Sequence, residues 1–204
     1  RYGEKGRERP GLIDGEGRLR DLSDHVDDIA GGALSPAGLD ALRALDPHQL
    51  PLVEGEPRLG PCVGRVGKFL CIGLNYSDHA AESGLVVPPE PVLFTKATSA
   101  IVGPNDDVRL PRGSTKTDWE VELGLVIGTE ARYVAEADAL DSVAGYCVVN
   151  DVSEREYQLE RHGTWDKGKG CDTFGPIGPW LVTPDEIADP SGLQMWLEVN
   201  GKRF

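Results

Sequence analysis

Hydrophobic and polar positions along residues 1–66 predict a small hairpin, one helix and a connector. Residues 11–13 and 18–20 flank a Gly-containing turn, which is typical of a small hairpin. A Ser-Pro pair at position 35 indicates a helix start, and leucines follow it at one-face spacing. Residues 46–66 are rich in Pro and Gly and lack periodicity, so we interpret them as a connector to the main domain.

Strand signals dominate from Phe69 onward. The pattern predicts strands over residues 69–72, 92–94, 119–128, 143–149 and 193–199. Short helices are predicted near residues 76–83, 135–143 and 153–162. This pattern favours an α+β, β-rich fold. We expect a mixed β-roll or barrel over residues 66–204, preceded by a small N-terminal α/β appendage and connector over residues 1–65.

The dipeptide Asn200-Gly201 is a strong signal for a tight hairpin turn. Residues 202–204 begin the returning strand, and the sequence stops there. Because a strand cut off this early leaves its partner unpaired, we expect the natural protein to continue beyond Phe204.

Composition narrows the classes of function. Hydrophobic residues make up 39% and charged residues 27%, as in soluble globular proteins. No apolar run approaches the ~20 residues that span a bilayer. The formal net charge of −13 argues against nucleic acid and against anionic membrane surfaces as partners. An anionic substrate still fits an acidic protein if a metal or a Lys/Arg cluster reverses the local field.

The cysteines form no CxxC pair and have apolar or Gly-rich neighbours. We expect reduced, structural thiols in a cytoplasmic protein, with two disulfides as the alternative. The four residues are Cys62, Cys71, Cys147 and Cys171.

The predicted strand over residues 119–128 carries two carboxylates on one face. Because strand side chains alternate, Glu120 and Glu122 lie together, about 7 Å apart, on a face that continues with small or apolar residues. Two adjacent carboxylates suit a bound cation, and the alternative is the solvated face of an edge strand. We expect the opposite face to be the core face, with Trp119, Val121, Leu123, Leu125 and Ile127.

A third carboxylate, Asp151, follows the apolar run at residues 143–149. It occupies a place where functional residues are common, and a helix cap is the alternative. Three carboxylates together are hard oxygen ligands suited to Mg²⁺, Mn²⁺ or Ca²⁺ rather than to Zn²⁺ or copper.

Two further segments carry candidate chemistry. On a short helix His79 and Glu82 would be neighbours on one face, so the carboxylate could orient the imidazole and raise its basicity. Gly73 and Gly84 bracket this segment and would let it move as a lid, whereas the alternative is an exposed surface helix. The Gly-rich stretch from residue 167 to 176 includes Lys169, which can bind a carboxylate, and a plain surface loop is the alternative.

Four blocks in the right order resemble the fumarylacetoacetate hydrolase superfamily. They read IGLNYSDHAAESG at residues 72–84, PVLFTKATSAIVGP at 91–104, DWEVELGLVIG at 118–128, and a block at 145–179 that contains NDVSERE and KGCDTFGPIGP. The resemblance covers about residues 69–204 and is closest to the bacterial branch with three carboxylate ligands. That branch includes acylpyruvate hydrolases and 2-hydroxyhepta-2,4-diene-1,7-dioate isomerases.

The resemblance implies a metal site and a β-roll catalytic domain. Glu120, Glu122 and Asp151 would hold Mg²⁺ or Mn²⁺, with Ca²⁺ as a substitute. The fold implied is the mixed β-roll of this family, assembled as a homodimer, and residues 1–65 would be the variable appendage that many members carry.

The same resemblance implies catalytic roles. His79 and Glu82 would form the dyad that activates water, and Lys169 would be the active-site lysine. Lys96 lies in a block that borders the pocket. The expected reaction is cleavage of a carbon–carbon bond in a 2,4-dioxo acid, such as fumarylpyruvate, maleylpyruvate or a 2,4-dioxo-3-deoxy sugar acid, with release of pyruvate. The alternatives are decarboxylation of a 2-oxo acid, isomerisation of a dienoate, a ureidoglycolate lyase-type reaction, or a catalytically silent member that only binds.

The sequence departs from the family pattern in two places. Animal members carry an additional Asp ligand before the catalytic His, and residues 72–75 contain none. Members also usually carry a C-terminal block with a T-G-T-P-type turn that lines the substrate site, and it is absent here.

Overall fold

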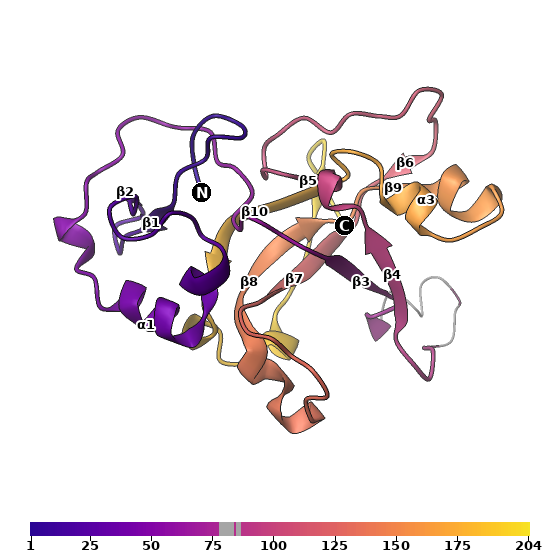
Figure 1. Cartoon of the computed structure of the whole chain (residues 1–204). Coiled ribbons are helices and arrows are strands. Elements are labelled where there is room, and N and C mark those ends of the chain that lie inside the picture. The colour runs from indigo at the N-terminus through magenta and orange to yellow at the C-terminus, as the bar shows by residue number, and fades with distance from the viewer. Residues whose placement is uncertain (78–83, 85–86) are drawn as a thin grey trace.

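The computed structural model describes residues 1–77, 84 and 87–204. Its largest sheet has the strand order β5-β10-β8-β7 (Figure 1). β10 runs parallel to β5, whereas β8 is antiparallel to both β10 and β7. These strands are β5 (Ile101–Val102), β7 (Val121–Ile127), β8 (Val143–Asn150) and β10 (Gly175–Val182).

Among the described residues, four further sheets consist of two antiparallel strands each. They pair β1 (Gly11–Ile13) with β2 (Leu19–Asp21), β3 (Phe69–Gly73) with β4 (Val92–Lys96), β6 (Thr117–Asp118) with β9 (Ser153–Glu154), and β11 (Glu198–Val199) with β12 (Lys202–Arg203). The α-helices among the described residues are α1 (Pro36–Arg43) and α3 (Asp166–Lys169). Short 3₁₀ segments are η1 (Gly31–Leu34), η2 (Pro47–Gln49), η3 (Thr98–Ala100), η4 (Glu136–Ser142), η6 (Pro184–Glu186) and η7 (Pro190–Gly192), and η5 (Glu156–Glu160) is a π-helical segment. The β-rich fold with few helices agrees with the prediction, and the described strands form separate sheets rather than one closed barrel.

The N-terminal hairpin and helix form where the sequence predicts them. β1 and β2 pair in an antiparallel register. The Ser35 hydroxyl accepts a hydrogen bond from the N–H of Gly38 at 3.1 Å, and Pro36 is the first helical residue. Within residues 46–66 the only regular element is the short segment η2.

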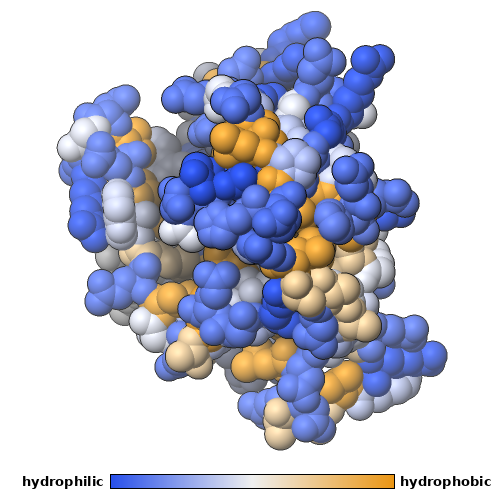
Figure 2. Space-filling view, turned by 90° about the vertical axis from the view of Figure 1, so that its left-hand side faces the viewer, coloured by the Kyte–Doolittle hydropathy of each residue, from blue (hydrophilic) through white to orange (hydrophobic). Residues whose placement is uncertain are grey.

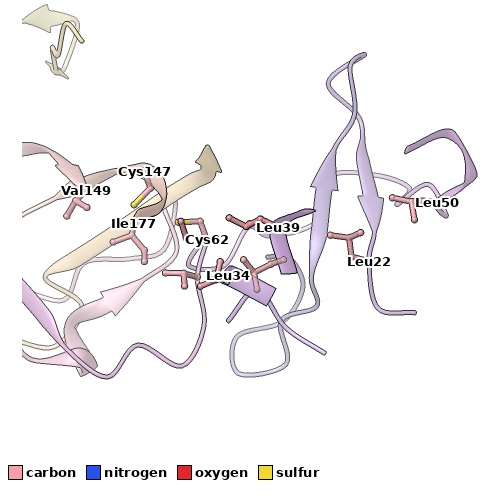
Figure 3. Close-up of a cluster of buried hydrophobic side chains, with 11 residues drawn as sticks. Leu22, Leu34, Leu39, Leu50, Cys62, Cys147, Val149 and Ile177 are labelled. Carbon is pink, nitrogen blue, oxygen red and sulfur yellow. The ribbon is translucent and has the colours of Figure 1, made fainter. Parts of the chain in front are cut away.

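One hydrophobic core joins the N-terminal part to the main sheet (Figure 3). The thiols of Cys62 and Cys147 meet in this core, and all four cysteines are free, as predicted. The N-terminal part is therefore anchored by packing. The core residues labelled in Figure 3 are Leu22, Leu34, Leu39, Leu50 and Cys62 from the N-terminal part, and Cys147, Val149 and Ile177 from the sheet.

The predicted orientation of the strand that carries the glutamates is wrong. Leu125 and Ile127 are 47% and 56% exposed, whereas Val126 packs against the core. A Cβ at Gly124 would lie 2.7 Å from the Val149 side chain, so core side chains cover this glycine closely. At this end of the strand, the face that continues from the carboxylates is therefore the one that packs against the core. The alternation of side chains did not identify the core face, because both faces of this strand carry apolar residues.

Three predicted elements differ in extent from the observed ones. The strand expected over residues 193–199 is limited to β11, although the Asn-Gly turn forms with the positive φ angles of 52° and 81° that this turn requires. The helix expected over 153–162 begins instead as β9 and continues as η5. The stretch from residue 167 to 176, expected to be a loop, begins inside α3.

One face of the molecule is mostly hydrophilic (Figure 2). Hydrophilic residues dominate the face that includes the N-terminal part, with hydrophobic areas interspersed among them (Figure 2). None of the helices in the described part of the chain is long and apolar enough to cross a membrane.

Candidate active site

The register of β7 and β8 brings Glu120 and Asp151 together. The ladder between the two strands ends with Val121 opposite Asn150. The next residue outward on each strand continues the contact, since the N–H of Asp151 donates to the carbonyl of Glu120 at 2.9 Å. Two carboxylates that are distant in sequence therefore emerge side by side at one end of the sheet.

Lys169 bridges these two carboxylates. Its Nζ lies 2.5 Å from Glu120 Oε2 and 2.8 Å from Asp151 Oδ2. The ammonium also lies 5.1 Å from the centroid of the Phe94 ring, within cation–π distance. The predicted proximity of Lys169 to the acidic cluster is thus present in the structure, with the lysine at the end of α3 and nearly buried.

Contacts with β3 and β4 hold α3 in place. Asp166 Oδ1 accepts the N–H of Thr95 at 2.9 Å. The Trp165 ring packs edge-on against Phe94 at a centroid distance of 5.5 Å. It also covers Gly73, where a Cβ would lie 2.4 Å from the ring. Any larger residue at position 73 would force the Trp165 ring, at the start of this helix, to shift.

Lys96 contacts Asp151 directly and does not merely border the pocket. Its side chain is completely buried, and Nζ donates to Asp151 Oδ1 at 2.6 Å and to the carbonyl of Val152 at 3.0 Å. Burial lowers the pKa of Lys96, and the charge of Asp151 opposes this effect. Both oxygens of Asp151 are therefore bonded to lysine ammonium groups.

Arg155 is a site residue that sequence reasoning did not identify. Its Nη2 lies 2.5 Å from Glu120 Oε1 and 2.7 Å from Asp118 Oδ2. The pairing of β6 with β9 sets Asp118 opposite Ser153 and brings the arginine within reach. In the run SERE an arginine resembles an ordinary surface charge, so the sequence carries no signal for this contact.

Glu122 differs from the other two carboxylates. Among the described residues no lysine or arginine forms an ion pair with it. Burial raises its pKa to about 7, and the charges of Glu120 and Asp151 act in the same direction. Tyr76 provides a hydrogen bond that opposes this rise. The site thus holds one carboxylate that no lysine or arginine in the described part of the chain neutralises.

The chemistry of this donor set fits a hard divalent cation. Three carboxylates are suitable ligands, and a cation would relieve the repulsion felt by Glu122. In the described part of the chain, no three His, Cys, Asp or Glu side chains already surround a point at which a metal could bind. The ammonium of Lys169 lies between Glu120 and Asp151, so a cation held by all three carboxylates requires this side chain to move aside.

The thiol of Cys71 lies near the charged groups of this site. Burial, helped by the charge of Asp151, raises the pKa of Cys71 to about 12. This thiol is therefore protonated at neutral pH and is not a thiolate nucleophile. His79 and Glu82, the predicted dyad, lie outside the described residues.

Comparison with known proteins gives a consistent result. The sequence matches a family model described as fumarylacetoacetate (FAA) hydrolase C-terminal over residues 68–204. A Burkholderia ambifaria protein with the name "Putative hydrolase" is 69% identical over 204 residues, which are the whole of this chain and 72% of that protein.

Solved structures resemble the chain in fold as well as in sequence. A fumarylacetoacetate hydrolase from Exiguobacterium antarcticum is 32% identical with a TM-score of 0.74, and the match covers 94% of this chain and 68% of that one. A 5-carboxymethyl-2-hydroxymuconate delta-isomerase from Mycobacterium smegmatis is 31% identical with a TM-score of 0.62, over 86% of this chain and 61% of that one.

Proposed function

This chain belongs to the fumarylacetoacetate hydrolase family, and on that premise we propose that it is a divalent-metal-dependent hydrolase of 2,4-dioxo acids. The reaction breaks the bond between C3 and C4 of an acylpyruvate. The hydroxyl of water goes to the acyl carbon, which leaves as a carboxylic acid. A proton goes to C3, which leaves as pyruvate.

The observation that carries this proposal is the meeting of Glu120 and Asp151 beside Glu122. Carboxylates on a buried face are costly unless cations balance them, and such arrangements recur at functional sites. A bound Mg²⁺ or Mn²⁺ would be held by these three residues, and it supplies positive charge to a developing enolate.

The remaining site residues have roles that follow from their charge. Lys169, whose ammonium is already in the site, offers a positive contact to a substrate oxygen. Lys96 holds Oδ1 of Asp151 and Arg155 holds Oε1 of Glu120, and so they orient both carboxylates. His79, oriented by Glu82, takes a proton from the attacking water and returns it to the leaving carbon.

A panel of 2-oxo and 2,4-dioxo acids tests the proposal. Purified protein is incubated with each acid and Mn²⁺ or Mg²⁺, with EDTA as the control. Products are followed as pyruvate, carbon dioxide or a shifted dienoate absorbance. We expect pyruvate from an acylpyruvate, and its loss with EDTA. Equal turnover with and without EDTA contradicts metal dependence.

One observation favours a second candidate, a dienoate isomerase. The solved structure from Mycobacterium smegmatis that resembles this chain bears the name of a delta-isomerase. An isomerase removes and returns a proton at a carbon next to the 2-oxo group. This reaction needs the same base and the same charged side chains as the hydrolysis. In the panel, a change of absorbance without release of pyruvate identifies this reaction instead.

A further inference from the structure

Glu154 is a carboxylate that the proposed mechanism does not use. It is fully buried, and no lysine or arginine in the described part of the chain forms an ion pair with it. Oε1 accepts the backbone N–H of Lys116 at 3.0 Å, and Oε2 accepts the backbone N–H of Tyr157 at 3.0 Å. A glutamate is seldom fully buried without a cation, so these two hydrogen bonds replace the water that the carboxylate loses.

The two bonds join the segment before β6 to the start of η5. β6 and β9 pair with Thr117 opposite Glu154. The carbonyl of Lys116 also accepts the N–H of Arg155 at 2.9 Å. The main chain of Arg155 is therefore flanked by the two N–H groups that the Glu154 carboxylate holds.

The neighbouring helix α3 confines this junction from another side. A Cβ at Gly168 would lie 2.4 Å from the carbonyl oxygen of Glu154, so the two backbones are in direct contact. The backbone at Glu154 is thus held by β6 through strand pairing and by α3 through close packing.

The side chain of Arg155 extends from this junction to the site. Its Nη2 lies 2.5 Å from Glu120 Oε1, and its Nε and Nη2 donate to Asp118 Oδ2 at 2.9 Å and 2.7 Å. Glu120 is one of the three carboxylates that would hold the cation. A metal ligand that a hydrogen-bonded partner already orients binds the metal more tightly than one without such a partner.

From these contacts we propose that Glu154 is a positioning residue, which fixes Arg155, thereby orients Glu120, and raises the affinity of the site for a divalent cation. The inference rests on the proposed function, because Glu120 belongs to the proposed metal site. Loss of a direct outer partner of a metal ligand typically weakens metal binding by about 10–100-fold. Glu154 acts one residue further out, so we expect an effect near the lower end of that range.

Calorimetric titration of Glu154→Asp with Mn²⁺ tests this proposal. Aspartate keeps the charge, but its shorter side chain cannot reach both N–H groups. We expect a Kd for Mn²⁺ about 10-fold above the wild-type value. The matched control is Glu156→Gln, which removes a charge two residues away, where Glu156 pairs with Arg161 at 2.7 Å, and it should bind Mn²⁺ nearly as the wild type does.

Glu154→Gln provides a second variant of the same length as the natural residue. Its amide N–H₂ group faces a backbone donor in place of a carboxylate oxygen, so one of the two hydrogen bonds is lost. Its Kd for Mn²⁺ should rise relative to that of Glu156→Gln, which carries the same change of charge. This comparison decides the question if the Asp variant does not fold.

A double-mutant cycle shows whether Glu154 acts through Arg155. In an Arg155→Met background the further change Glu154→Asp should leave the Kd for Mn²⁺ unchanged. Additive losses overturn the proposal, and so does a wild-type Kd in the folded Glu154 variant, even if its urea midpoint falls. Both results leave the proposed function standing. If the wild-type protein binds no Mn²⁺, the metal site and the role of Glu154 are overturned together.

Discussion

Single residues in the site differ in how their charge is balanced. Asp151 has an ammonium group on each oxygen and Glu120 has a lysine and an arginine, whereas Glu122 forms no ion pair with a lysine or arginine among the described residues. A buried charge is stable only with partners that replace its hydration. The cations around Glu120 and Asp151 therefore contribute to folding as well as to chemistry.

Removal of Lys96 tests the contribution of these cations to folding. Lys96→Met leaves the buried Asp151 carboxylate without one of its partners, so we expect the free energy of unfolding to fall by about 3–5 kcal/mol. Urea denaturation measures this change. Lys116→Met is the control, because it breaks an exposed pair with Glu160 and should hardly move the urea midpoint. A wild-type midpoint for Lys96→Met would contradict the buried pair.

The predicted general base gives a second test at this scale. His79→Ala should lower turnover of the best acylpyruvate by about 10²–10⁴ because proton transfer from water loses its acceptor. Steady-state kinetics at saturating Mn²⁺ measure it. His48→Ala, at an exposed position in η2, is the control and should keep full turnover. Full turnover of the His79 variant would remove this residue from the mechanism.

At the scale of elements, short strands depend on polar contacts and close packing at their ends. The turn between β1 and β2 is held by Asp14, whose carboxylate accepts the backbone N–H groups of Glu16 and Arg18 and the guanidinium of Arg20. Two strands of three residues bury little surface, so this carboxylate network stabilises the hairpin.

The Asp14 network predicts a pH-dependent stability. Burial alone would raise the pKa of Asp14, but hydrogen bonds from Arg18 and Arg20 hold it well below its usual range. A lowered folded-state pKa stabilises the fold above the unfolded value of about 3.9, and this stabilisation is lost as pH falls further. Asp14→Asn should therefore lower the urea midpoint at pH 7, with the difference from wild type shrinking below about pH 4. Asp24→Asn, at an exposed position, should show no difference at either pH.

Close packing at the end of β7 predicts an intolerant glycine. A Cβ at Gly128 would lie 2.2 Å from the backbone oxygen of Leu34 and 2.7 Å from the Ala144 Cβ. Gly128→Ala should cost about 1–3 kcal/mol of unfolding free energy, measured by urea denaturation. Gly67→Ala, which meets open space, is the matched control. Equal midpoints for the two variants would contradict this contact.

At the scale of the whole molecule, a continuous core joins two parts that the sequence presents as separate. Leu34 and Cys62 from the N-terminal part pack with Cys147 and Val149 of β8. The division at residues 65/66 and the homodimer both remain predictions. The exposed apolar residues Leu125 and Trp180 lie on strands of the main sheet.

The shared core predicts one unfolding transition. Every tryptophan lies after residue 118, so tryptophan fluorescence reports the main domain alone. Leu34→Ala should lower stability by about 2–5 kcal/mol and shift the fluorescence and far-UV circular dichroism midpoints equally. Leu52→Ala, at an exposed position, should shift both only slightly. An unmoved fluorescence midpoint for Leu34→Ala would mean that the two parts unfold independently.

The sequence alone determined the features that depend on neighbours along the chain. Ser35 caps α1, Asn200-Gly201 forms its turn, and alternation sets Glu120 and Glu122 on one face, because backbone geometry and local hydrogen bonds govern each of these. Family resemblance added Asp151 and Lys169 to the same site, and the structure brings them together with Glu120.

Tertiary structure decided everything that depends on partners distant in sequence. Strand order and register decide which face of β7 packs against the core, and they bring Lys96 and Arg155 to the carboxylates. A lysine or an arginine looks the same in sequence whether it meets water or a buried carboxylate. Its partner is set by packing, and packing is a property of the whole fold.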